Sequence, residues 1–254
     1  MKVIGLLSGK GGVGKTSSAI NLAAALNHFG KQVILCDANL TTPNVGLYLG
    51  TPAPQVTLHH ALKGKKTLYD ALQRHPSGFH FVAGSLALDD MKDLRLQRFK
   101  QLRELDADYV ILDGAPGLGK EVLTIMENAD ELIVVTNPEL PAITDALKTV
   151  KLAEELGKKI LGVLVTRVKN DELDISLRNI ESLIEYPIIG VIPEDGTIRE
   201  AQAVKDAIIH THKNAPATEG YLKLAASICG TAYVPELQQN WAVKVWNLLL
   251  GKRV

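Results

Sequence analysis

Short, continuous apolar runs alternate along the chain with longer segments in which apolar residues recur at helical spacing. Runs that are apolar at every position are typical of strands buried on both faces, as in parallel sheets that are covered by helices. The pattern therefore predicts an α/β fold with a mostly parallel, twisted sheet and helices on both faces. The predicted strands cover residues 3–7, 33–36, 79–82, 109–112, 132–136, 160–166 and 188–192.

The segments between these strands predict helices. Residues 16–29 form an amphipathic run that ends at Gly30, and residues 217–229 form another that ends at Gly230, a residue that favours a helix C-terminus. Shorter helical pieces are expected at residues 57–62 and 67–72. In open parallel sheets, ligands bind at the carboxyl ends of the strands, so the residues just after each strand are the first candidates for a functional site.

The first predicted strand is followed at once by the segment GKGGVGKT, residues 9–16. It matches the phosphate-binding pattern G-x-x-x-x-G-K-[ST] at every fixed position, and it stands between a strand and a helix as the pattern requires. Backbone N–H groups of such a loop surround an anion, Lys15 reaches the β- and γ-phosphates, and the Thr16 hydroxyl coordinates Mg²⁺. The predicted nucleotide-binding residues of this loop are Gly11, Gly12, Val13, Gly14, Lys15, Thr16 and Ser17.

Two aspartates end predicted strands. Asp113 ends the apolar run 109–112, which is the Walker B arrangement, where the carboxylate binds Mg²⁺ through water. Asp37 ends the run 33–36 and is a candidate for holding the same ion through water. The alternative for Asp37 is a carboxylate that caps a helix or a turn. The predicted metal-binding residues are therefore Thr16, Asp37 and Asp113.

The loop contains a second lysine, Lys10, that the general pattern does not require. A side chain there projects from the outer lip of the loop, where it is either solvated or reaches phosphates bound by a second subunit. With the glycines it gives KGGVGKT, which resembles the deviant Walker A motif of the MinD/ParA family of dimerising ATPases. The resemblance covers nearly the whole chain, is strongest to archaeal-type MinD proteins, and implies that Lys10 acts in trans.

The resemblance also implies two switch segments. Residues 37–39 look like the first switch, where the family usually has a second aspartate that orients the attacking water. This chain has Asn39 there, and because an amide positions water without accepting a proton, we expect slow ATP hydrolysis, with catalytic roles for Lys10, Lys15 and Asn39. The segment DGAPG resembles the second switch, although MinD proteins more often carry D-x-P-A-G. Its predicted residues are Gly114, Pro116 and Gly117.

Two later loops are expected to surround the base. Relatives usually have Asn-Arg or Asn-Lys at the end of the strand predicted at residues 160–166, and the asparagine reads the purine. This chain has Thr166 and Arg167, and a threonine hydroxyl offers one donor where an amide offers a donor and an acceptor. We expect stacking by Arg167 and the backbone near Pro193 to contribute. The predicted residues on the base side are Thr166, Arg167, Pro193 and Glu194.

The last segment, residues 241–254, is strongly apolar. On a helix, its tryptophans, valines and leucines cover a broad arc beside a narrow polar stripe. One interpretation is a terminal helix that packs on the body or on a second subunit, and the other is an interfacial anchor on anionic lipid. MinD proteins end in an amphipathic membrane-targeting helix, so the resemblance favours the anchor. The predicted membrane residues are Trp241, Val245, Trp246, Leu248, Leu249, Lys252 and Arg253.

The 254 residues suit an ATPase domain over residues 1–230, followed by a connector and C-terminal helix over residues 231–254. Lysine plus arginine and aspartate plus glutamate balance at 28 each, so no specific nucleic acid partner is expected. Cys36 and Cys229 form no zinc or disulfide motif, which fits a reducing compartment. The N-terminus enters the first strand at once, and no apolar run approaches the roughly 20 residues that span a bilayer.

The remaining polar clusters carry no chemistry in this interpretation. The segment KGKK, residues 63–66, is interpreted as a solvated turn in preference to a contact with nucleic acid or lipid. The histidines His59, His60, His75 and His80 lack metal-ligand spacing and are interpreted as surface or helix-packing residues.

The leading hypothesis is a MinD-like ATPase that dimerises face to face on binding ATP and Mg²⁺. It would cycle between the cytoplasm and the cytoplasmic face of the cell membrane, because two weak anchors on one dimer bind more tightly than one, and would position cell-division or other polar machinery. The expected partners are a second copy, an anionic membrane surface and an unidentified activating or cargo protein. The alternatives are a ParA-like DNA segregation ATPase, a metal-cluster carrier and a small-molecule kinase.

Overall fold

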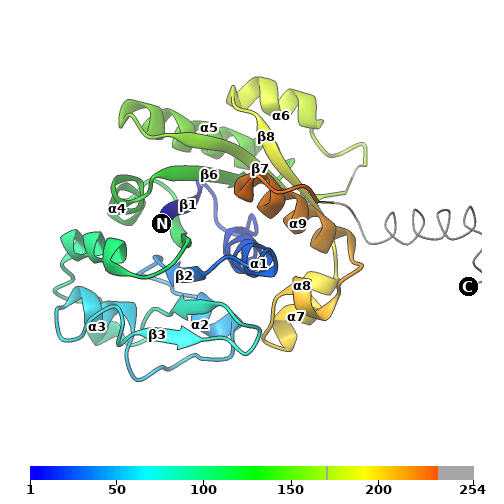
Figure 1. The fold of residues 1–254 in the computed structure, drawn as a ribbon. Helices are drawn as coiled ribbons and strands as arrows, with labels where there is room; N and C mark the ends of the chain where they lie inside the picture. Colours follow the sequence, from blue (N-terminus) through cyan, green and yellow to red (C-terminus); the bar gives the residue numbers. More distant parts are fainter. Residues whose placement is uncertain (170, 234–254) are drawn as a thin grey trace, which may run out of the picture.

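A single sheet forms the centre of the molecule (Figure 1). The structure is a computed structural model that describes residues 1–169 and 171–233. Over these residues the strands lie in the order β3-β4-β2-β5-β1-β6-β7-β8, and every neighbouring pair is parallel except β3 with β4. The predicted mostly parallel sheet is confirmed. The strands are β1 (Lys2–Ser8), β2 (Val33–Asp37), β3 (Leu72–Arg74), β4 (His80–Val82), β5 (Tyr109–Pro116), β6 (Glu131–Thr136), β7 (Ile160–Val168) and β8 (Ile188–Pro193).

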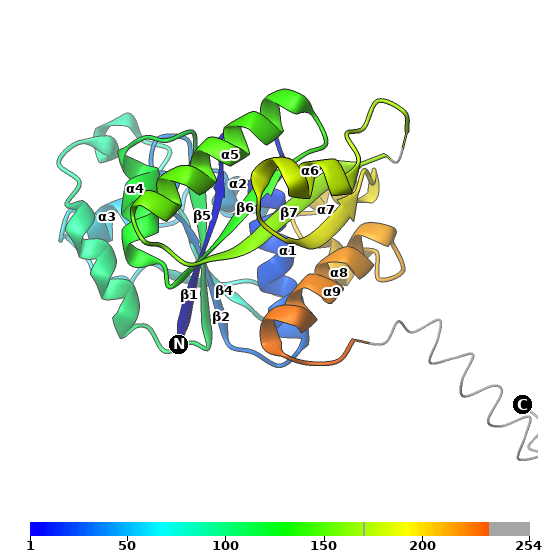
Figure 2. The same cartoon turned by 90° about the horizontal axis from the view of Figure 1, so that it is seen from above.

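The central strands are apolar on both sides because each lies between two helical layers (Figure 2). In β1, Ile4 and Leu6 belong to the core beneath α1, α8 and α9, whereas Val3 and Leu7 belong to the core beneath α3, η2 and α4. Helices α5 and α6 cover β6 and β7. The helices are α1 (Lys15–His28), α2 (Val45–Tyr48), α3 (Leu58–Leu62), α4 (Lys120–Asn128), α5 (Leu140–Glu155), α6 (Leu177–Ile184), α7 (Thr197–Ala203), α8 (Ile208–Thr211) and α9 (Pro216–Cys229), with the 3₁₀ helices η1 (Leu88–Met91) and η2 (Leu96–Glu104).

Helix α1 lies against α9, and both helices end where the sequence predicts. Gly30 follows the last turn of α1 with a φ of 75°, and Gly230 follows α9 with a φ of 67°, so each glycine adopts the left-handed conformation that terminates a helix. The hydroxyls of Ser18 and Tyr221 form a buried hydrogen bond of 3.2 Å between the two helices. The helix that follows the phosphate loop is therefore tied to the last described helix.

One predicted helix is wrong. Residues 67–72 form a turn that leads directly into β3, because the side chains of Thr67 and Asp70 bond each other and each other's backbone N–H groups. The backbone then pairs antiparallel with β4, with Leu72 opposite Val82. Leu68 and Ala71 lie three positions apart and are both buried. This spacing is typical of a helix, but the turn buries the same two side chains.

The histidines fit their predicted interpretation only in part. His59 on α3 is fully buried, bonds the Leu40 carbonyl through Nε2 and accepts the Ser85 N–H at Nδ1. His75 lies neither on the surface nor on a helix, because its ring is buried and stacks on Phe79 with a centroid distance of 5.0 Å. Tertiary packing of the β3–β4 hairpin placed His75 inside, and no local pattern predicts that.

No helix within residues 1–169 and 171–233 combines the length and the apolar character that crossing a bilayer requires. The predicted membrane residues between Trp241 and Arg253 lie outside the described residues, as does most of the second predicted segment, residues 231–254. Both assignments stay predictions.

Candidate functional site: a phosphate loop with two buried carboxylates

The loop between β1 and α1 is closely packed at its start and strongly turned at its end. A Cβ atom at position 9 would lie 2.3 Å from the carbonyl oxygen of Asp145 on α5, so only glycine fits there. Gly14 has a φ of 84°, a left-handed conformation that glycine adopts without steric cost, and α1 begins at the next residue, Lys15. The unpaired N–H groups of the first turn of α1 therefore lie beside the loop, where an anion binds favourably.

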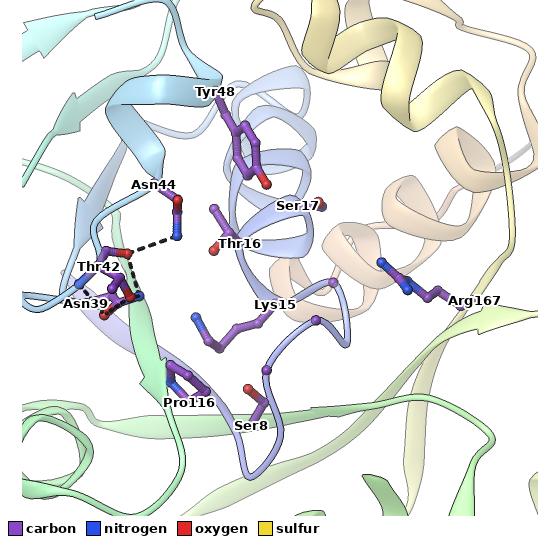
Figure 3. A pocket seen from close by; sticks show the side chains of 13 residues that line it. Ser8, Lys15, Thr16, Ser17, Asn39, Thr42, Asn44, Tyr48, Pro116 and Arg167 are labelled. Atoms are coloured by element: carbon purple, nitrogen blue, oxygen red, sulfur yellow. Dashed lines mark hydrogen bonds between the residues drawn. The ribbon is translucent and has the colours of Figure 1, made fainter. Parts of the chain in front are cut away.

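A cleft of about 280 Å³ lies at this loop, at the carboxyl end of the sheet (Figure 3). Three segments meet there: the loop with the start of α1, the residues after β2, and the end of β5. Arg167, at the end of β7, points towards the cleft from the opposite side in Figure 3. The lining residues are Ser8, Gly11, Gly12, Gly14, Lys15, Thr16, Ser17, Asn39, Thr42, Asn44, Tyr48, Pro116 and Arg167.

Two carboxylates lie beneath this cleft. The parallel register of β2 and β5 sets Asp37 opposite Asp113, and both are fully buried. Burial raises the pKa of Asp37 to about 8, and the neighbouring Asp113 carboxylate adds to the rise. Lys15 Nζ donates a hydrogen bond of 2.6 Å to Asp113 Oδ1, so one ammonium group faces two buried acids.

The unpaired oxygens of these acids test whether a divalent cation fits. Asp37 Oδ2 accepts the Val45 N–H at 2.9 Å, but Asp37 Oδ1 and Asp113 Oδ2 are buried with no hydrogen-bond partner among the described residues. Buried oxygens without partners are costly, and oxygen ligands are what Mg²⁺ prefers. The donor set Thr16, Asp37 and Asp113, with Thr16 in the lining of the cleft, therefore fits Mg²⁺.

The segment after β2 forms a closed turn. Asn39 Nδ2 donates to the Thr42 carbonyl at 2.7 Å, and the Thr42 N–H donates to Asn39 Oδ1 at 3.2 Å. Glu121, in the first turn of α4, accepts hydrogen bonds from the Thr41 hydroxyl at 2.6 Å and from the Leu40 N–H at 3.2 Å. The first predicted switch is thus fastened to the helix that follows the second.

The second predicted switch lies directly against β1. A Cβ atom at position 114 would lie 2.8 Å from the Leu6 carbonyl oxygen, and the Gly117 N–H donates to the Ser8 carbonyl at 2.9 Å. Gly117 has a φ of 89°, which favours glycine, and Pro116 reaches the cleft. This segment therefore contacts the end of β1, directly before the phosphate loop.

Lys10 occupies a different environment from Lys15. Its side chain is 41% exposed, and Nζ forms an ion pair of 3.0 Å with Glu139, whose side chain is 57% exposed. Lys15 is buried and lines the cleft, whereas Lys10 does not line it. Within one loop, Lys15 therefore points into the cleft, whereas Lys10 points out of it towards Glu139.

A second cavity, of about 120 Å³, adjoins the cleft and shares Gly14, Ser17 and Arg167 with it. The predicted residues Thr166, Arg167, Pro193 and Glu194 all line this cavity, with apolar walls from Ile192 and Ile198. The Thr166 hydroxyl lies beneath the loop, within 2.6 Å of the Val13 carbonyl and 3.0 Å of the Thr136 carbonyl. Thr166 therefore supports the loop backbone, and its only donor is occupied.

Comparison with known proteins identifies the family. The model of the ParA family, described as NUBPL iron-transfer P-loop NTPase, matches residues 1–229. This chain belongs to the ParA family of P-loop NTPases. ParA-family NTPases hydrolyse ATP, so the protein is an ATPase, as its phosphate loop predicts.

The chain is similar to other ATP-binding proteins in sequence and to solved structures in fold. An uncharacterized ATP-binding protein of Methanocaldococcus jannaschii is 36% identical, with 98% of this chain and 97% of that protein covered. The septum site-determining protein MinD of Synechocystis is 32% identical over 85% of this chain and 81% of its own. The structure of MinD complexed with Mg-ADP from Pyrococcus horikoshii has a TM-score of 0.84 and 28% identity, and covers 89% of this chain and 95% of its own. This ParA-family protein therefore resembles MinD in sequence and fold.

Several residues at this ParA-family site were not predicted from the sequence. Thr42 and Asn44 follow the end of β2, and residues after strand ends were already candidates for the functional site. Their position in the sequence could therefore have indicated them. Tyr48 lies at the end of α2, a helix of four residues that is too short to show a periodicity. Gln202 on α7 lines the second cavity and donates to the Ser17 hydroxyl at 2.7 Å, and nothing in its sequence neighbourhood marks it.

The two cysteines lie apart from the cleft. Cys36 in β2 is fully buried, and burial raises the pKa of its thiol. Cys229 ends α9 and is partly exposed. Within the part of the chain that the structure describes, no three His, Cys, Asp or Glu side chains are grouped so that they could hold a metal ion.

Proposed function

We propose that this protein is a MinD-like ATPase, two copies of which join face to face across ATP and Mg²⁺. The dimer cycles on and off a membrane and positions cell-division or other polar machinery, and hydrolysis is slow. The observation that carries the proposal is the position of Lys10, which stands on the outer lip of the phosphate loop and outside its own cleft.

The residues of the cleft have distinct roles in this proposal. The loop N–H groups and Lys15 bind the phosphates, and Thr16, Asp37 and Asp113 hold Mg²⁺, which neutralises charge on the phosphate oxygens when it is bound. Asn39 orients the attacking water once its turn with Thr42 opens. The partner's Lys10 adds a positive charge to the phosphates, as an arginine finger does.

Lys10 is suited to act on a second subunit because its present contact is weak. Its ion pair with Glu139 is exposed to water on both sides, and exposed pairs stabilise a protein by about 0–1 kcal/mol. The polyphosphate of a partner carries more negative charge than one carboxylate. The lysine therefore leaves Glu139 at low cost when a second nucleotide-loaded cleft approaches.

The rim of the cleft is also suited to self-association, because it carries exposed leucines. Leu118 follows Gly117 in the second switch and is 42% exposed, and Leu140 follows Glu139 and is 60% exposed. Leu173 is 90% exposed and lies in a loop that is held beside Pro138 by a backbone hydrogen bond from Ile175. Exposed large apolar side chains on segments that adjoin the phosphate loop favour burial by a second protein surface.

The names of two relatives support the biological role. One is described as a septum site-determining protein, and another is a MinD protein that binds Mg-ADP. Because the match to each covers more than four-fifths of both chains, the same cycle is a reasonable proposal for this chain.

Molecular mass in solution tests the dimer. By light scattering, the wild type is expected to have the mass of one 27.5 kDa chain with ADP and about twice that mass with a nonhydrolysable ATP analogue. Lys10→Ala should stay monomeric with both nucleotides while binding ADP as the wild type does. Lys92→Ala is the matched control, because Lys92 forms an exposed ion pair with Asp89 on η1. A wild-type mass that ignores the nucleotide would refute the dimer.

Vesicle co-sedimentation tests the membrane step. The full-length chain should bind vesicles that contain anionic lipid more strongly with the ATP analogue than with ADP, because a dimer presents two anchors. Removal of residues 241–254 should abolish this binding and leave ADP affinity unchanged. Equal binding of the full-length and truncated chains would refute the membrane anchor, and binding to nonspecific DNA instead would favour the DNA segregation alternative.

A further inference from the structure

The phosphate cleft and the second cavity share Gly14, Ser17 and Arg167, and Ser17 follows Thr16 in the first turn of α1. The cleft contains Lys15 and Thr16, so it takes the phosphates, and the second cavity has apolar walls that suit a flat base. A nucleotide that spans both would pass its ribose across these shared residues, among which Ser17 carries a hydroxyl. The polar groups near this residue decide how the sugar is held.

Most polar side chains near this junction already have partners. The Thr166 hydroxyl is bonded beneath the loop, and the Tyr221 hydroxyl pairs with Ser18. Asp195 accepts hydrogen bonds from Thr197 and from the Ala217 N–H. These three side chains line the cavity, but each already forms its hydrogen bonds with other groups of the protein.

Gln202 differs from these side chains. Its Nε2 donates a hydrogen bond of 2.7 Å to the Ser17 hydroxyl, which fixes the amide at the junction. Its Oε1 makes no hydrogen bond to any described residue, and a side-chain amide oxygen accepts up to two. An acceptor held in place beside Ser17 is thus available to a ligand.

We infer that Gln202 binds the ribose of the nucleotide, with Oε1 accepting a hydrogen bond from a ribose hydroxyl while Nε2 stays on Ser17. The inference rests on the ATP binding of the proposed function and is independent of dimerisation and of the membrane. It makes Gln202 a residue that favours a nucleotide whose ribose carries that hydroxyl over the deoxy analogue that lacks it. A hydroxyl is the matching donor, and a sugar without it makes no hydrogen bond to Oε1.

Displacement of a fluorescent nucleotide from the full-length protein by ADP, 2′-deoxy-ADP and 3′-deoxy-ADP tests the inference without any turnover. The wild type should bind ADP about fivefold to tenfold more tightly than one of the two deoxy analogues, which is the effect of one neutral hydrogen bond. Gln202→Leu should bind ADP and that analogue with equal affinity. Gln202→Glu keeps an acceptor and should keep the preference.

Two controls make the result specific. Gln97→Leu, on η2 and far from the cleft, should change neither affinity. Glu194→Gln, which removes the charge of an exposed carboxylate on the cavity rim, should keep the ribose preference. The inference is overturned if Gln202→Leu retains the wild-type preference, or if it weakens ADP and both deoxy analogues by the same factor. If the proposed dimer does not form, this measurement is unaffected, because one chain alone binds ADP.

Discussion

The phosphate side and the base side of the proposed nucleotide site are built in different ways. Just over half of the residues that line the phosphate cleft come from one continuous segment, residues 8–17, which also contains Lys15. The base side is assembled from distant segments, and its hydrogen bonds join residues 153 and 185 positions apart, Thr166 to Val13 and Gln202 to Ser17. In this proposal phosphate recognition is encoded more locally than recognition of the nucleoside, which depends on contacts between distant segments.

The largest expected effect separates the two lysines of the phosphate side. Lys15→Gln should weaken ADP binding by about 100-fold, because it removes a charge-assisted contact and keeps only a neutral donor. Lys10→Gln, the matched change, should leave ADP affinity within about twofold, since an exposed ion pair contributes little. Calorimetric titration with ADP measures both. Equal losses in the two variants would mean that Lys10 lies along its own nucleotide.

The next effect tests the close packing of the phosphate loop at Gly9 against α5. Gly9→Ala should lower the free energy of unfolding by about 3 kcal/mol, because the new methyl group would collide with the backbone of α5. Gly11→Ala is the control in the same loop, since a Cβ there meets nothing within 4 Å, and should change stability by less than about 0.5 kcal/mol. Denaturant unfolding without nucleotide provides the measurement. Similar losses in both variants would contradict the close approach at Gly9.

A smaller effect distinguishes support of the loop from contact with the base. Thr166→Val should lower the free energy of unfolding by about 1–2 kcal/mol, because the Val13 and Thr136 carbonyls lose their donor. ADP and GDP should lose affinity by the same factor, since the hydroxyl is already bonded to the Val13 and Thr136 carbonyls. A change in the ratio of the two affinities would return Thr166 to the purine-reading role.

The smallest effect concerns the water that attacks the phosphate. Asn39→Asp should raise the hydrolysis rate by about tenfold or less, because a carboxylate accepts a proton as well as orienting water. Asn179→Asp, at an exposed asparagine on α6 that does not line the cleft, should leave the rate unchanged. Phosphate release under saturating ATP and Mg²⁺ measures both. An unchanged rate in Asn39→Asp would remove Asn39 from the catalytic residues.

The sequence predicts the parts of this molecule that depend on short-range patterns. Continuous apolar runs predicted the buried strands, and the spacing of Gly9, Lys15 and Thr16 predicted the loop and its position between β1 and α1. The prediction of a helix at residues 67–72 was wrong because a turn can bury Leu68 and Ala71 as well as a helix can. The roles of Gln202 and Glu121 were not predictable, since each makes its contact with a segment that is remote in the chain.

The edge of the sheet at β3 has a consequence for how copies of this chain associate. β3 has only three residues, runs antiparallel to β4 and ends at the exposed Arg74, so it offers few free backbone groups to another strand. Edge-to-edge addition of strands would be open-ended and would lead to fibres, whereas the proposed pairing through the rim of the cleft would close after two copies. The short strand thus discourages polymers along that border, which complements the proposed assembly through the nucleotide-binding face.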